Sequence, residues 1–150
     1  MRKIWIHYGN DCFNPEKVKE NAKKLFSNKP NGLWASPVGR NFWSWKRWCE
    51  SEDYHTERLE KYFKFRVSSK ANLLWIHKLS DAEKYMIAEP YYPGSKYCSY
   101  KLNVEEVMNK FDGMVLIHGN HYCELHDNGF YTWDVDSICV WNPDMIELIK

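Results

Sequence analysis

Asp134 and Asp136 lie one residue apart, directly before a short apolar run at residues 137–141. This run predicts a strand that is buried on both faces. The strand should end at Asn142 and Pro143, because proline cannot donate to the hydrogen-bond ladder. Alternate residues of an extended chain point to the same face, so we expect the two carboxylates to point together. Such a pair among aromatic residues can hold a polar ligand against an apolar wall; the alternative is that both are solvated residues of a turn.

A second group of ligand-type side chains consists of His118, His121, Cys123 and His126. Histidine and cysteine are the preferred ligands of zinc. This spacing fits no closed structural zinc site, however, and four ligands so close in sequence would crowd one ion. We therefore predict a polar loop that carries histidines and no metal site. Glycine-rich phosphate-binding loops are absent, and no local signature supports a catalytic Cys–His pair.

Residues 41–50 combine aromatic and basic side chains, with Phe42, Trp45 and Trp48 at helical spacing. Rings flanked by arginine and lysine can stack on a nucleotide or on single-stranded nucleic acid. The alternative is an amphipathic helix whose tryptophans face the core. The formal net charge of +1 gives no general attraction to nucleic acid or to an anionic membrane, which counts against a nucleic-acid binder.

The elements that must position these groups are short. Alternating or continuous apolar residues predict strands at residues 3–8, 32–37, 63–67, 72–77, 114–117 and 137–141. Cap residues and helical spacing predict helices at residues 15–25, 41–50, 80–86 and 103–111, with a last helical turn at 144–149. Residues 89–100 contain two prolines and a glycine and are interpreted as a loop. Because strands outnumber helices and do not alternate regularly with them, we predict an α+β fold with antiparallel sheets and small flanking helices.

Composition sets further limits. A chain of 150 residues can form one core, so we predict a single domain over residues 1–150, and we expect a monomer. No apolar run is long enough to span a bilayer, and the amino terminus has too short an apolar run for a secretory signal. The five dispersed cysteines favour reduced thiols and a cytoplasmic location, including the cytoplasm of a host cell. The small size and heavy use of tryptophan would suit a phage or mobile-element protein.

The order of the candidate motifs resembles the ADP-ribosyltransferase superfamily, the fold shared by bacterial NAD-using toxins and eukaryotic transferases. A first strand ends in His7-Tyr8-Gly9, and a short strand ends in Trp34-Ala35-Ser36 before the aromatic helix. The last motif along the chain is the pair of carboxylates, Asp134 and Asp136, directly before a buried strand. The resemblance implies a split antiparallel β-sandwich, with NAD bound as a substrate in a cleft between the sheets.

The resemblance also implies roles for individual residues. Asp136 would be the catalytic acid, and Asp134 would lie at the position that often tunes the acceptor. The residues assigned to NAD binding are His7, Tyr8, Gly9, Trp34, Ser36, Phe42 and Trp45. The chain departs from the family pattern because its acid is Asp in place of the usual Glu, and because it lacks both the Ser-Thr-Ser triplet and the spaced tyrosine pair of the two main branches.

These features lead to the expectation of an NAD-dependent ADP-ribosyltransferase that modifies a macromolecule, protein or nucleic acid. The alternatives are an NAD glycohydrolase, in which water is the acceptor, and a non-catalytic binding or inhibitor protein on the same fold. Cleavage of the nicotinamide–ribose bond passes through an oxocarbenium-like state, which a carboxylate stabilises in a water-poor cleft. On this basis Asp136→Asn should lower turnover by roughly 10²–10³ and leave the fold intact.

Overall fold

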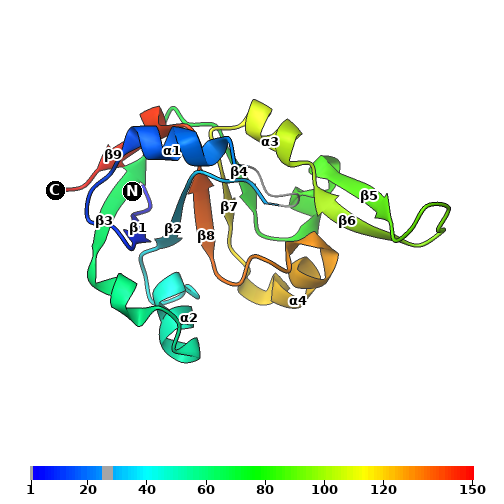
Figure 1. Ribbon diagram of the computed structural model, residues 1–150, viewed down its shortest axis with the longest axis horizontal. Coiled ribbons are helices and arrows are strands. Elements are labelled where there is room, and N and C mark those ends of the chain that lie inside the picture. Colours follow the sequence, from blue (N-terminus) through cyan, green and yellow to red (C-terminus); the bar gives the residue numbers. More distant parts are fainter. Residues whose placement is uncertain (1, 25–28) are drawn as a thin grey trace.

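The computed structural model describes residues 2–24 and 29–150. Seven strands form one curled sheet in the order β4–β7–β8–β2–β1–β3–β9, and the pair β5–β6 stands apart from it (Figure 1). All neighbours in the large sheet are antiparallel except β4 and β7. The predicted α+β class, with a mainly antiparallel sheet and a few small helices, is therefore confirmed.

The strands are short, and most fall where alternation or apolar runs predict them. The strands of the large sheet are β1 (Trp5–Tyr8), β2 (Leu33–Pro37), β3 (Tyr62–Val67), β4 (Leu73–Ile76), β7 (Gly113–Leu116), β8 (Ser137–Val140) and β9 (Ile146–Leu148). Every residue of β7 and β8 is buried, as expected for central strands covered on both faces.

The central strands separate two hydrophobic cores. In β7, Met114 and Leu116 belong to a first core that also contains Cys139 of β8. Val115 and Ile138 point to the other face and belong to a second core. The alternation of an extended chain thus places neighbouring residues of the same strand in opposite cores.

Two of the helices, α1 (Pro15–Ala22) and α3 (Val104–Lys110), begin directly after a predicted capping residue, and a one-turn helix, α4 (Tyr122–Leu125), has no side-chain cap. Asn14 caps α1, whose buried Val18 packs into the second core. Ser44 caps α2 (Trp45–Glu52), and Asn103 caps α3 by accepting a hydrogen bond from the Glu106 amide. Helix α3 and α4 cover the first core.

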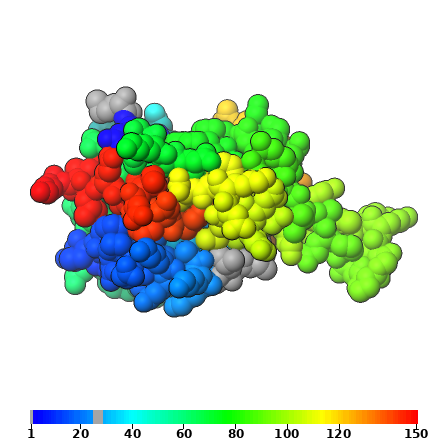
Figure 2. Space-filling view, turned by 90° about the horizontal axis from the view of Figure 1, so that it is seen from above, coloured from blue at the N-terminus to red at the C-terminus, as the bar shows by residue number. Residues whose placement is uncertain are grey.

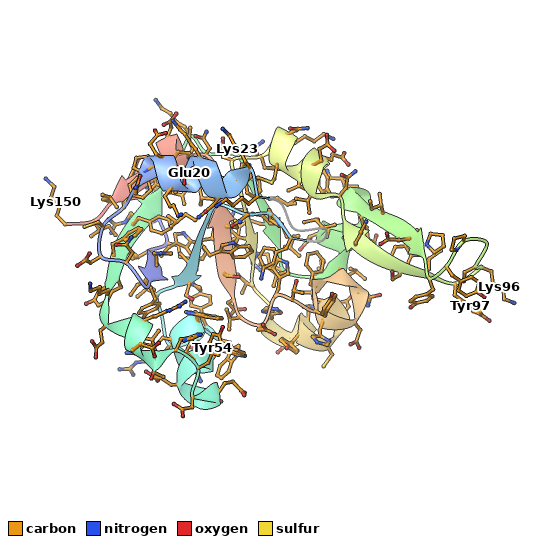
Figure 3. All side chains as sticks on the ribbon, in the orientation of Figure 1. Glu20, Lys23, Tyr54, Lys96, Tyr97 and Lys150 are labelled. Carbon is orange, nitrogen blue, oxygen red and sulfur yellow. The ribbon has the colours of Figure 1, made fainter. Side chains whose placement is uncertain are left out.

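The strands β5 (Met86–Pro90) and β6 (Cys98–Leu102) form a hairpin that projects from the body of the molecule. Figure 2 shows the hairpin standing clear of the remaining chain. Four exposed tyrosines lie on or near it: Tyr91, Tyr92, Tyr97 and Tyr100. Figure 3 places Lys96 and Tyr97 at its outer end.

Several predicted elements differ from the structure. The loop predicted at residues 89–100 contains most of β6 and the end of β5. Pro93 and Gly94 lie in the connection between these two strands, and Pro90 ends β5. The helix predicted at residues 80–86 is replaced by two 3₁₀ turns, Leu79–Asp81 and Glu83–Tyr85, and the aromatic helix begins only at Trp45. The last helical turn is a 3₁₀ turn, Pro143–Met145, followed by β9. The end predicted for the first helix, residue 25, lies outside the described residues.

Within residues 2–24 and 29–150, no helix has both the length and the apolar surface needed to cross a bilayer. All five cysteines are free thiols.

Candidate functional site

A cavity of about 320 Å³ opens between strands β1 and β2, the start of α2 and the segment that leads into β8. Its wall is largely aromatic, with Tyr8, Trp34, Trp45 and Trp133 among its residues. The remaining lining residues are Ile6, His7, Lys29, Ala35, Ser36, Thr132, Asp134, Val135 and Ser137. We call this the first cavity. A mainly apolar wall with a few polar groups is typical of small-molecule sites.

His7 brings a hydrogen-bonding group of fixed orientation to the first cavity. Its Nδ1 lies 2.7 Å from the backbone oxygen of Trp34, on the neighbouring strand. A carbonyl oxygen only accepts, so Nδ1 carries the hydrogen and Nε2 is left as an acceptor. Burial lowers the pKa of His7, and the hydrogen bond to Trp34 opposes this effect only in part. His7 is therefore a neutral imidazole at pH 7, suited to accept a hydrogen bond from a ligand hydroxyl or amide.

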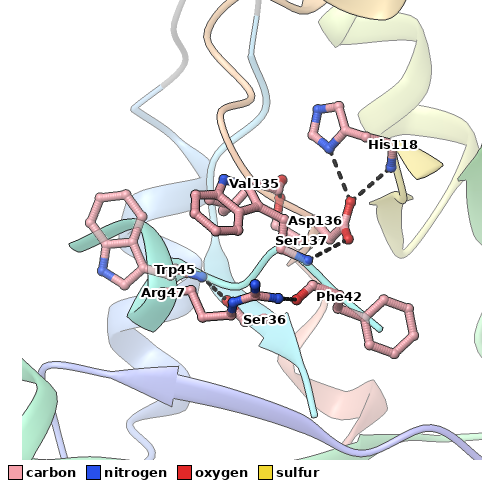
Figure 4. A network of polar contacts seen from close by, with 9 residues as sticks. Ser36, Phe42, Trp45, Arg47, His118, Val135, Asp136 and Ser137 are labelled. Atoms are coloured by element: carbon pink, nitrogen blue, oxygen red, sulfur yellow. Dashed lines mark hydrogen bonds and ion pairs between the residues drawn. The ribbon is translucent and has the colours of Figure 1, made fainter. Parts of the chain in front are cut away.

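Ser36 and Trp45 are joined at the point where β2 passes to α2. The Trp45 amide donates to Oγ of the buried Ser36 across 2.9 Å, as Figure 4 shows. The Trp45 ring stacks on Trp48, with centroids 5.1 Å apart, and both rings meet Tyr54 edge to face. This packing fixes the wall that Trp45 presents to the first cavity.

Trp34 and Trp133 form another part of the wall, and their rings meet edge to face at 4.8 Å between centroids. The Nζ of Lys29 lies 4.5 Å from the centroid of Trp34 and donates to the backbone oxygen of Thr132 across 2.9 Å. Burial lowers the pKa of Lys29, while the nearby Asp134 carboxylate acts in the opposite direction. The cavity thus combines stacking surfaces with one cation and one carboxylate.

Asp136 faces away from the first cavity and joins two distant segments of the chain. Its Oδ1 accepts from the His118 amide at 2.8 Å and from His118 Nδ1 at 3.0 Å, and its Oδ2 accepts from the Trp43 amide at 3.0 Å (Figure 4). The Asp136 amide in turn donates to the Trp43 backbone oxygen. The hydrogen bonds to Asp136 therefore tie the end of β7 to the turn before α2.

Asp134 is exposed and lies on the rim between two cavities. It lines the first cavity and also a second cavity of about 470 Å³, which Asp136 and His118 border as well. The other residues of the second cavity are Asn41, Trp43, Trp48, Glu52, Gly119 and Tyr122. Both carboxylates of the predicted pair therefore border the second cavity, but Asp134 is exposed and Asp136 is buried. The strand β8 begins only at Ser137, so both acids precede the extended part of the chain.

The structure brings six of the nine predicted site residues into the first cavity: His7, Tyr8, Trp34, Ser36, Trp45 and Asp134. Three others do not line it. Gly9 follows β1 with a φ of +101° and donates its amide to the Lys61 backbone oxygen. Phe42 packs under the Lys3 ammonium, 4.3 Å from the ring centroid, and Asp136 occupies the buried position described above.

The histidines of the histidine-rich segment form separate pairs with carboxylates. His118 pairs with Asp136, His121 with Glu124, and His126 with Asp127. Across the described residues, no group of three or more histidine, cysteine or carboxylate side chains is placed to hold a metal ion.

Lys29, Thr132 and Trp133 are cavity residues that the sequence did not single out. Trp133 adjoins Asp134 in an aromatic-rich segment, and this was the signal available for it. Lys29 gives no such signal, because a lysine beside Pro30 is ordinarily a solvated loop residue. Only the packing of its segment against Trp34 and Trp133 brings it into the wall.

Comparison with protein-family models, with curated proteins and with solved structures found no match.

Proposed function

We propose that this protein binds NAD in the first cavity and cleaves the bond between nicotinamide and ribose, transferring ADP-ribose to a protein or nucleic acid. The observation that carries the proposal is the meeting of His7, Trp45 and Asp134 in one aromatic cavity, although they are far apart in sequence. The resemblance of the motif order to ADP-ribosyltransferases supports the same proposal, and with it an ADP-ribosyltransferase-like arrangement of the sheet.

Each group has a physical role in this proposal. The indole faces exclude water and stack on the nicotinamide ring, and His7 Nε2 accepts a hydrogen bond that orients the dinucleotide. The volume of about 320 Å³ is at the small end of ligand pockets, which suits the nicotinamide half of NAD with the adenosine half extending outward.

We assign the carboxylate that stabilises the oxocarbenium-like state to Asp134 and not to Asp136. Both Asp136 oxygens already accept hydrogen bonds from the protein, whereas Asp134 borders the first cavity and is exposed. A negative charge beside the reacting ribose stabilises the positive charge that develops there, and a bound ligand would cover Asp134 from the side of the first cavity. Because Asp134 also borders the second cavity, an acceptor held there would lie next to the reacting carbon.

The test is release of free nicotinamide from NAD by the purified protein. Release in buffer alone indicates hydrolysis, and release that requires added cell lysate indicates transfer to an acceptor. Asp134→Asn should lower the rate by roughly 10²–10³ with the thermal midpoint unchanged. The matched control is Asp144→Asn, because Asp144 is an exposed carboxylate that lines neither cavity. Equal rates for wild type and Asp134→Asn would remove Asp134 from the mechanism.

A second candidate is a protein that binds NAD without turning it over. The structural hydrogen bonds to both oxygens of Asp136 favour it, since the residue matched to the family acid is held by the protein and does not line the first cavity. In that case NAD at 100 times its dissociation constant should stabilise the protein by about 2.7 kcal/mol. No nicotinamide would appear, with or without lysate.

A further inference from the structure

Lys29 is the one cationic side chain that lines the first cavity in the described chain, and it is held in place by its surroundings. Its Nζ lies 4.5 Å from the Trp34 centroid and 5.6 Å from the Trp133 centroid. One of its three N–H groups donates to the Thr132 backbone oxygen. The other two N–H groups have no acceptor among the described residues and can donate to a ligand.

Two more donors in the same wall have no partner among the described residues. These are the Oγ1 of Thr132 and the Nε1 of Trp133, both buried. Trp133 is only 2% exposed, so its indole N–H cannot rely on bulk water. A buried donor without a partner is costly, and native structures ordinarily satisfy nearly all of them. Both residues line the first cavity, but neither atom is exposed at its surface, so a ligand there satisfies them only when the two side chains shift.

The chemistry of these three groups selects the kind of ligand. An indole N–H and an ammonium only donate, so their common partner must be rich in acceptors. A phosphate oxygen meets this requirement, and charge-assisted hydrogen bonds to it are among the strongest available. Asp134 on the cavity rim disfavours an anion, and the Lys29 ammonium offsets that repulsion.

We propose that Lys29, Thr132 and Trp133 form a phosphate-binding subsite of the first cavity. The ligand is a nucleoside phosphate, whose ring stacks on the indole walls while its phosphate accepts from these donors. In the proposed function, which this inference builds on, the bound group is the phosphate next to the nicotinamide ribose.

The experiment compares ligands that differ only by the phosphate. Nicotinamide mononucleotide and nicotinamide riboside are titrated by calorimetry against the full-length protein, and AMP and adenosine form a second pair. Wild type should bind each phosphate-bearing member at least about tenfold more tightly. Lys29→Met should abolish this preference while leaving the nucleosides' affinity unchanged, and Lys29→Arg should retain part of it.

Two results would overturn the subsite: equal affinity of wild type for both members of each pair, or an equal loss for both members in Lys29→Met. The thermal midpoint of each variant shows whether it is folded. If Lys29→Met is unfolded, the affinities measured for Lys29→Arg test the subsite instead. Binding of AMP that depends on Lys29, without binding of either nicotinamide compound, would support the subsite and refute the NAD assignment. Binding of both nicotinamide compounds without a phosphate preference would support the NAD assignment and refute the subsite.

Discussion

The carboxylate of Asp136 accepts hydrogen bonds from two segments far apart in the sequence, the residues after β7 and the turn before α2. Its neighbour Asp134 accepts none in the described chain, and it borders two cavities. Two acids of the same type, two residues apart, thus serve different purposes because one is buried among donors and the other faces solvent. A substitution at each should separate stability from activity.

Asp136→Asn should lower the free energy of unfolding by about 2–4 kcal/mol, because an amide cannot accept from all three donors and places its own N–H group against one of them. Chemical denaturation monitored by circular dichroism measures the loss. Asp134→Asn is the control and should change stability by no more than about 0.5 kcal/mol. The sequence-based expectation was that Asp136→Asn leaves the fold intact, and a loss of stability no larger than that of the control would favour that expectation.

The stability of the protein should depend on pH in acid because of the Asp136 carboxylate. Burial alone would raise the pKa of this carboxyl, but the hydrogen bonds from His118 and Trp43 outweigh it and hold the pKa below the ordinary value of 3.8. The unfolded chain therefore takes up the proton first as pH falls. The stabilisation that ionised Asp136 provides is complete above about pH 5 and is lost as pH drops through the pKa of the folded protein. The stability difference between wild type and Asp136→Asn should shrink as pH falls below about 4, and a difference that grows in acid would contradict this expectation.

At the scale of elements, the β5–β6 hairpin is fixed at its root by one glycine. Gly129 has a φ of +102°, and a Cβ there would lie 2.7 Å from both Met86 Cε and the Tyr100 backbone oxygen. The segment His126–Phe130 can approach β6 closely only because this residue has no side chain. The position therefore couples the hairpin to the rest of the chain.

Gly129→Ala should destabilise the protein by about 1–3 kcal/mol more than Gly94→Ala. Gly94 also has a positive φ, +84°, but no atom lies within 4 Å of a Cβ built there. The control thus reproduces the backbone strain without the steric contact. Thermal unfolding of the two variants measures the difference, and equal losses would show that the contact at Gly129 relaxes freely.

The elements that local signals specify are those that the sequence predicts well. Asn14 and Asn103 cap helices, and the apolar run at residues 137–140 is a buried strand, because propensity and burial agree there. The hairpin was missed since its prolines and Gly94 indicate a loop, and Pro90 is tolerated only because it ends an edge strand. The contact between Asp136 and His118 depends on strand pairing across the sheet, which no local pattern encodes.

At the scale of the whole molecule, one sheet serves two hydrophobic cores. The first core contains Leu74, Leu116 and Leu125, and the second contains Trp5 and Ile138. Because β7 and β8 contribute side chains to both cores, disruption of one core also disturbs the strands on which the other core packs. The shared layer supports the prediction of a single domain, which the following experiment tests.

Unfolding in denaturant should therefore be one cooperative transition. Tryptophan fluorescence and far-ultraviolet circular dichroism should give coincident curves. Leu125→Ala, a change at a fully buried side chain, should lower the midpoint by the same amount in both, for a loss of about 2–5 kcal/mol. Two separated transitions, or a shift in only one probe, would mean that the cores unfold independently.

The projecting hairpin also determines how the chain responds to cutting. Lys96 is exposed at its outer end, where a protease can engage the backbone, so brief trypsin treatment should nick the chain there first. The two pieces would share the large sheet, because β7, β8 and β9 of the later piece pair with β4, β2 and β3 of the earlier one. The nicked protein should therefore elute as one species under native conditions and separate only in denaturant, so the two halves could be expressed apart and reassembled by fragment complementation.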